Sequence, residues 1–117
     1  MITEIAFYVY PVSNMARARR FYEEVLNLKV ESNSGDEWVE YAVGNGTFAI
    51  TTTDPEHKPG VHGGVVAFEV LHLDTTLNRF KELDVPFVRE VFATPVCRAA
   101  VVADPDGNHI IIHKRNV

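Results

Sequence analysis

Two glutamates and two histidines are the residues whose types and positions could support chemistry: Glu4, Glu69, His109 and His113. A histidine beside a carboxylate can act as a general acid or base near neutral pH, and such a pair can also bind a metal ion. His109 and His113 lie in one β-branched run, an even number of residues apart, so both point to the same face of a strand. We predict catalytic roles for Glu4 and His113.

Strand alternation gives each of these residues its neighbours on the same face. Glu4 shares a face with Tyr8, and Glu69 shares one with Val65. The alternate positions are almost wholly apolar, as expected of a face covered by a helix, whereas the faces that carry the glutamates and histidines are mixed. Alternation and the family resemblance given below together predict one mixed face, which consists of Glu4, Ala6, Tyr8, Phe48, Ile50, Thr52, Val65, Ala67, Glu69, Leu71, His109, Ile111 and His113. The expected covered face includes Ile5, Phe7, Val9, Val66, Phe68, Val70, Ile110 and Ile112.

The last of these strands follows the turn sequence Asp-Pro-Asp-Gly-Asn at 104–108, where proline presets one corner and glycine accepts positive φ at the next. A weaker copy of this region occurs earlier, because a shift of 61 residues carries Gly107 onto Gly46 and Ile111 onto Ile50. The same shift carries residues 67–70 onto residues 6–9. The sequence therefore predicts an internal repeat.

Each half of the chain has the same predicted order, β-α-β-β-β. The first half has strands at 2–10, 28–31, 37–43 and 47–52, and its helix begins after a Ser13 or Asn14 cap and ends at Asn27 in the left-handed conformation. The second half has strands at 65–71, 85–92, 96–103 and 108–113, with a helix capped by Asp74. We expect one domain, with module 1 at about 1–53, a Pro/Gly-rich linker at 54–64 and module 2 at about 65–117.

Composition excludes several classes of protein. The net charge of −5 does not suit nucleic acid, and no apolar run approaches the roughly 20 residues that span a bilayer. We therefore expect a cytoplasmic protein with no nucleic-acid or membrane partner. Cys97 is the only cysteine, so neither an intrachain disulfide nor a thiolate zinc cluster can form. Beside Arg98 it could be an activated thiol, but a small buried strand residue is the expected role.

The chain resembles the glyoxalase/bleomycin-resistance/extradiol-dioxygenase superfamily, also called vicinal oxygen chelate. The resemblance lies in the two β-α-β-β-β units, in Phe21-Tyr22 inside the first helix and in the 104–108 turn before the last strand. The resemblance covers essentially the whole chain. It implies an α+β fold in which tandem βαβββ modules form an open, cup-shaped mixed sheet with the helices outside. It also implies a homodimer.

The family's metal enzymes take ligands from the first and last strands of each unit. Carried onto this sequence by the resemblance and the 61-residue shift, these positions are Glu4, Ile50, Val65 and Ile111. Of the four, only Glu4 can bind a metal, whereas a catalytic site usually needs three protein ligands. We therefore expect no metal and no cofactor.

The mixed face, with aromatic and aliphatic walls and few polar groups, suits a small amphipathic organic ligand. The expected function is binding of such a compound, as in the bleomycin-resistance branch. The alternative is a lyase, isomerase or dioxygenase-type enzyme that uses Glu4 with His109, His113 or Glu69, including one with a rearranged metal site. The expected ligand-binding residues are Tyr8, Trp38, Phe48, Ile50, Val65, Glu69, His109 and Ile111. Alternation leaves open whether Trp38 or Tyr41 faces the ligand.

Overall fold

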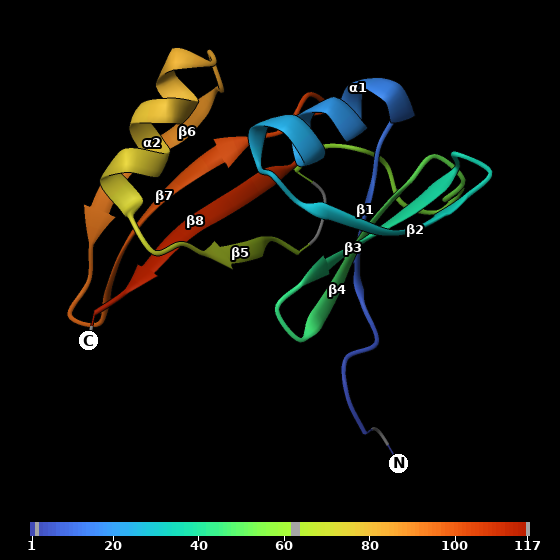
Figure 1. Cartoon of the computed structure of the whole chain (residues 1–117), viewed down its shortest axis with the longest axis horizontal. Helices are drawn as coiled ribbons and strands as arrows, with labels where there is room; N and C mark the ends of the chain where they lie inside the picture. Colours follow the sequence, from blue (N-terminus) through green and yellow to red (C-terminus); the bar gives the residue numbers. More distant parts are fainter. Residues whose placement is uncertain (2, 62–63, 117) are drawn as a thin grey trace. The chain divides into compact units, whose positions relative to one another are not determined.

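The computed structural model describes residues 1, 3–61 and 64–116. The chain divides into two compact units, Met1–His62 and Gly63–Val117 (Figure 1). Each unit contains one helical segment and one four-stranded mixed sheet. The predicted α+β class and the tandem β-α-β-β-β order are confirmed.

The first unit runs β1 (Tyr8–Pro11), α1 (Met15–Arg20), a π-helical turn η1 (Phe21–Val25), β2 (Lys29–Ser34), β3 (Trp38–Val43) and β4 (Gly46–Thr51). Its strand order is β1-β4-β3-β2, with β1 parallel to β4 and the other pairs antiparallel. The parallel pair needs a long crossover, which the helix and the two following strands provide.

Local sequence accounts for both ends of this helix. The Asn14 side chain caps it by accepting a hydrogen bond from the Arg17 amide at 3.0 Å, as predicted. The amide of Leu26 then donates to the Phe21 carbonyl, five residues back, which gives the π-helical turn. Asn27 has a φ of 57°, the left-handed conformation expected at this end.

Aromatic rings form the core of the first unit. Tyr22 from η1 packs against Phe48 of β4 and Tyr41 of β3, with ring centroids 5.1 and 6.2 Å apart. Tyr10 of β1 meets Phe48 edge to face at 5.4 Å. Tyr22 and Tyr41 are fully buried, and Phe48 is nearly so. The helical segment is therefore held to one face of the sheet by large apolar contacts.

The second unit runs β5 (Val66–Glu69), α2 (Leu73–Glu82), β6 (Phe87–Ala93), β7 (Cys97–Ala103) and β8 (His109–Arg115). Its order, β5-β8-β7-β6 with β5 parallel to β8, repeats that of the first unit. The apolar stripe of α2 is buried and consists of Leu73, Leu77 and Phe80.

The turn at 104–108 closes on itself. Asp104 is buried, and its Oδ1 accepts hydrogen bonds from the amides of Asp106 and Asn108 at 2.9 and 2.8 Å. Its Oδ2 accepts from the Asn108 side-chain amide at 2.8 Å. Gly107 has a φ of 82°, which explains why glycine stands there. The turn therefore fixes the start of β8 and offers no chemistry of its own.

Three predicted boundaries are wrong. The first strand begins at Tyr8 instead of residue 2, so Glu4 lies in an exposed segment before it, while Ile2 lies outside the described residues. The N-cap of α2 is His72, which leaves Asp74 in the first helical turn. Strand β2 continues to Ser34 because the reversal falls at Gly35 and Asp36, both with positive φ.

Within the described part of the chain, no helix is both long enough and apolar enough to cross a membrane. Cys97 is a buried strand residue, as expected.

Candidate functional site

The helix-covered face of the first sheet is not the predicted one. Paired residues of neighbouring strands point to the same side, and Tyr8 pairs with Phe48 while Tyr10 pairs with Ile50. Phe48 packs against Tyr22, so this whole set faces the helical segment. The prediction that Phe48 and Ile50 lie on the uncovered face is wrong, because both are core residues, 2% and 0% exposed.

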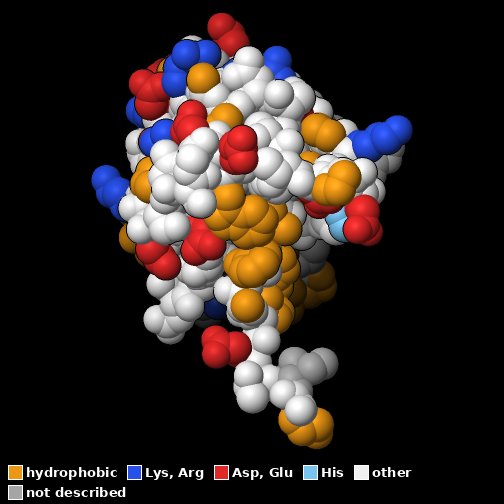
Figure 2. All heavy atoms as spheres, turned by 90° about the vertical axis from the view of Figure 1, so that its right-hand side faces the viewer, with side chains coloured by type: hydrophobic (Ala, Val, Ile, Leu, Met, Phe, Trp, Pro, Cys, Tyr) orange, Lys and Arg blue, Asp and Glu red, His pale blue; other side chains and the backbone are white. Residues whose placement is uncertain are grey.

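The other face of the first sheet is uncovered by the helical segment and carries Trp38. The Trp38 ring meets the Phe7 ring edge to face, with centroids 5.3 Å apart, and its Nε1 donates to Glu40 Oε2 at 2.8 Å. Tyr41 points into the core, which answers the question that alternation left open. Phe7 is 43% exposed, and Figure 2 shows hydrophobic side chains gathered beside the N-terminal segment. Exposed apolar patches of this kind are typical of surfaces that bind other molecules.

Structural equivalence between the units explains the reversed face. Helix α1 begins at Met15 and α2 at Leu73, so the offset between the units is 58 residues at the helix. The pair Tyr10 and Ile50 corresponds to the pair Phe68 and Ile112. The offset is therefore 58 residues at the first strand of each unit and 62 at the last strand. Both offsets differ from the sequence-based 61 by an odd number, and an odd shift moves a residue to the opposite face.

With these offsets, Phe7 and Ala49 occupy the positions equivalent to Val65 and Ile111. Glu4 and Ile50, to which the resemblance carried the first two ligand positions, do not. Glu4 and Val65 are both exposed. The four equivalent positions thus carry Phe7, Ala49, Val65 and Ile111, none of which has a side-chain oxygen or nitrogen to bind a hard or borderline metal ion.

In the second unit the predicted faces are confirmed. Arg98 of β7 forms an ion pair with Asp74 of α2 at 2.8 Å, so the Arg98 face is the one that α2 covers. That face holds the most buried residues of the sheet, namely Ala100, Val102, Ile110 and Ile112. The uncovered face holds Ala67, Glu69, Ala99, Val101, His109, Ile111 and His113.

This uncovered face of the second unit brings Glu69 and His113 together. The strand register pairs them, and Glu69 Oε1 lies 2.5 Å from His113 Nδ1. Glu69 Oε2 also accepts a hydrogen bond from the Arg115 amide at 2.7 Å. The Arg115 amide and then the His113 side chain lower the pKa of Glu69, because both hydrogen bonds favour its ionised form. In this pair, the ionised Glu69 carboxylate accepts a hydrogen bond from the His113 imidazole.

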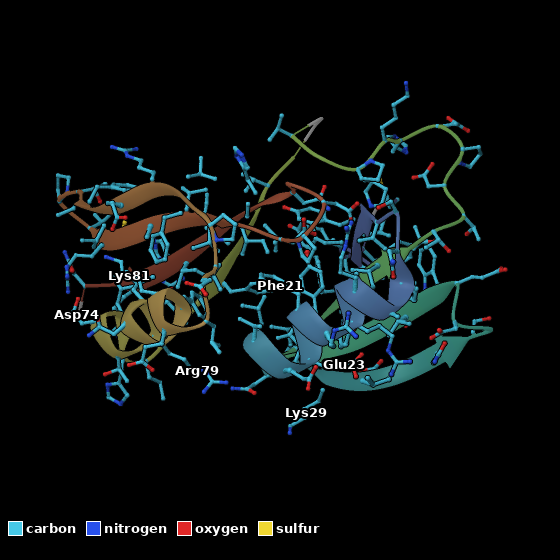
Figure 3. All side chains as sticks on the ribbon, turned by 90° about the horizontal axis from the view of Figure 1, so that it is seen from above. Phe21, Glu23, Lys29, Asp74, Arg79 and Lys81 are labelled. Carbon is cyan, nitrogen blue, oxygen red and sulfur yellow. The ribbon has the colours of Figure 1, made fainter. Side chains whose placement is uncertain are left out.

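A second polar cluster lies on the helical side of the first unit. Arg19 forms ion pairs with Glu23 at 2.7 Å and Asp36 at 2.9 Å, and the Tyr41 hydroxyl donates to Glu23 at 2.9 Å. Figure 3 labels Glu23 on the helical segment of this unit. Burial raises the pKa of Glu23, but the bonds from Arg19 and Tyr41 outweigh it and leave the pKa below its usual value. A surface pocket is lined by these charges. Since Arg19 pairs with both carboxylates and Tyr41 donates to Glu23, we assign the cluster a structural role.

Sequence reasoning missed Phe7 and Ala49 as residues of the uncovered face. The helix caps were the signal that could have found them: Asn14 and His72 follow Tyr10 and Phe68 by the same number of residues. Among the described residues, no three of the types His, Cys, Asp and Glu are grouped closely enough to hold a metal ion.

The fold and these faces define a class, the α+β proteins built from two βαβββ units, each with a sheet covered by a helix on one face. Within that class, the chain belongs to the Glyoxalase/Bleomycin resistance protein/Dioxygenase superfamily, whose family model matches residues 4–112. A search of curated protein sequences found no match.

Solved structures share the fold along the whole chain. An antibiotic-binding protein, TnmS3 from Streptomyces sp. CB03234, is 24% identical, with a TM-score of 0.83 over 98% of each chain. A lactoylglutathione lyase from Agrobacterium tumefaciens is 18% identical, with a TM-score of 0.77 over 97% of this chain and 94% of that one. A glyoxalase/dioxygenase from Nostoc punctiforme is 16% identical, with a TM-score of 0.80 over 97% and 92%.

Proposed function

We propose that this protein binds a small amphipathic organic compound on the uncovered faces of its sheets, without the metal centre of its family's enzymes. The observation that carries the proposal is the set of residues at the four equivalent ligand positions. Phe7, Ala49, Val65 and Ile111 are all apolar and offer no metal donor. Phe7 and Val65 are 43% and 48% exposed, whereas Ala49 is buried. The similarity to an antibiotic-binding protein supports the same function.

The composition of each uncovered face, taken by itself, agrees with an amphipathic ligand. The face of the first unit carries the Phe7–Trp38 ring pair beside the Glu40 carboxylate. The face of the second unit carries Ile111 and its alanine neighbours beside the Glu69–His113 pair. Apolar area supplies most of the binding free energy in such sites, while a few polar groups set the orientation. The homodimer remains a proposal, whereas Tyr8 shares the helix-covered face with Phe48 and lies outside the proposed surface.

The test is a titration with the amphipathic dye 8-anilinonaphthalene-1-sulfonate, followed by fluorescence and calorimetry. We expect saturable, stoichiometric binding to the native protein. Trp38→Ala and Ile111→Ser should each weaken binding by about tenfold, the effect of losing about 1.4 kcal/mol of contact.

The control is Val96→Ala, which shortens a 69% exposed side chain in the turn before β7 and should leave binding unchanged. Near-ultraviolet circular dichroism confirms that each variant keeps its fold, since this dye also binds partly unfolded proteins. Equal affinity in all three variants would contradict the proposal.

The second candidate function is a metal-free lyase or isomerase, and the Glu69–His113 pair favours it. A bound compound recovered unchanged agrees with simple binding. If the bound compound is instead converted to a product in the presence of chelator, and Glu69→Gln abolishes the conversion, the protein is a metal-free enzyme. Loss in Glu4→Ala instead would restore the predicted catalytic role of that residue.

A further inference from the structure

The Glu69 carboxylate is fully engaged on the uncovered face of the second unit. One oxygen pairs with His113 Nδ1 and the other accepts from the Arg115 amide. An ionised carboxylate can only accept hydrogen bonds, so Nδ1 of His113 must carry the proton of this contact. In the neutral imidazole, Nε2 is then left with a lone pair and acts as an acceptor. The contact therefore fixes one tautomer.

The His113 imidazole is partly exposed. The side chain is 27% exposed, and no residue in the described ranges forms a hydrogen bond with Nε2. The other titratable groups on this face are His109 and Arg115 from β8 itself, Glu69 from β5, Cys97 from β7 and Arg89 from β6, which pairs with Val101. The negative charge nearest to the imidazole is that of Glu69, which disfavours a second carboxylate from a ligand.

Apolar residues adjoin His113 on one side. Across the sheet, His113 pairs with Ala99, and the next row on the same face is Ala67, Ile111 and Val101. On its other side His113 pairs with Glu69, while on β6 Arg89 lies over the Phe92 ring, which pairs with Ala99. The alanines that flank β8 place no large side chain beside Ile111 and His113. A planar ring can lie on this row and direct a substituent toward the imidazole.

We propose that His113 Nε2 accepts a hydrogen bond from a weakly acidic hydroxyl group, a phenol or an enol, carried on a planar apolar ring of the ligand. An acidic hydroxyl is a strong hydrogen-bond donor, and Nε2 of the tautomer fixed by Glu69 is a hydrogen-bond acceptor. This inference rests on the proposed function and names the class of compound that is bound. His113 is then a specificity residue that contacts the ligand.

The test compares 2-naphthol with 2-methoxynaphthalene, which has the same ring system but cannot donate a hydrogen bond. Both are titrated at about pH 8, where an ordinary imidazole is neutral, and dissociation constants are measured by NMR. We expect the wild-type protein to bind 2-naphthol about tenfold more tightly, the effect of one hydrogen bond. In His113→Phe, which keeps a ring but has no acceptor, the two affinities should become equal.

The chain contains a matched control. His57 pairs with Asp54 at 2.7 Å in a segment outside the strands, so it is a second imidazole paired with a carboxylate. His57→Phe should keep the tenfold preference. A third compound, 2-naphthoate, should bind more weakly than 2-naphthol.

Four outcomes would overturn the inference. Equal affinities in the wild type, or a preference that survives His113→Phe, would remove the hydroxyl contact while leaving the proposed binding of organic compounds intact. Tighter binding of 2-naphthoate would assign the site to anions instead. Failure of all three compounds to bind, in a protein that also fails to bind the dye, would overturn the proposed function as well.

Discussion

Single residues on the second sheet show how hydrogen bonds set a charge state. Glu69 is exposed, so burial contributes little, and its two partners lie at fixed positions on β8. Both partners donate to the carboxylate and favour its ionised form. The folded protein therefore binds the Glu69 proton less readily than the unfolded chain does.

This difference predicts how stability depends on pH. Since the folded pKa of Glu69 lies below its usual 4.5, the stability it contributes is fully present above that value and is lost as pH falls through the folded pKa. Urea denaturation should show wild-type protein more stable than Glu69→Gln at about pH 6 and the gap closing toward about pH 3. Glu31→Gln, an exposed change on β2, is the control. A gap that stays constant over this range would contradict the prediction.

Alternation within β8 placed His109, Ile111 and His113 on one face without tertiary information, and the family resemblance added Glu69 to that face. It could not pair Glu69 with His113. Those residues are 44 positions apart, and their contact depends on the parallel register of β5 and β8. Register between distant strands is set by the crossover between them and not by either strand's own sequence.

At the scale of elements, the error in the first unit came from treating the repeat as rigid. The two units match with different offsets at their first and last strands because their connections differ in length. A sequence comparison that applies one shift to the whole chain cannot represent both offsets. For strands this matters more than for helices, since a slip of one residue turns core positions into surface positions.

The turn that leads into β8 should be a major source of local stability. Asp104→Ala would leave the amides of Asp106 and Asn108 without the carboxylate they donate to. We expect a loss of about 2–3 kcal/mol in the free energy of unfolding, measured by urea titration, because charged acceptors in buried sites are costly to remove.

Asp74→Ala is the matched control for that turn. It removes a carboxylate of the same type that is 73% exposed in an ion pair with Arg98, so its effect should stay below about 1 kcal/mol. Equal losses in the two variants would mean that Asp104 acts only through general electrostatics.

At the scale of the whole molecule, the tandem order of elements identified the family before any side chain was placed. The order was predictable because caps, turns and alternating strands recur in both halves of the sequence. Ligand positions were not predictable in the first unit, because they require the correct face of β1 and β4 as well as the correct fold.

Metal ions should not stabilise the protein, because the four equivalent ligand positions carry Phe7, Ala49, Val65 and Ile111. A native-state ligand raises the melting temperature by mass action. Thermal melts with Ni²⁺, Zn²⁺ and Mn²⁺ should therefore match the melt in chelator, and metal analysis of protein purified without chelator should find no stoichiometric ion. A shift that disappears in Glu4→Ala or His113→Ala would show a rearranged metal site.

The alternation along β8 also bears on how this protein could change over generations. Ile110 and Ile112 are locked in the core, while Ile111 and His113, their immediate neighbours, lie on the uncovered face. Under the proposed function, adjacent residues of one strand are thus subject to separate selective pressures, one for folding and one for ligand binding. A mutational library restricted to the second set should change the proposed ligand preference while leaving the fold unchanged.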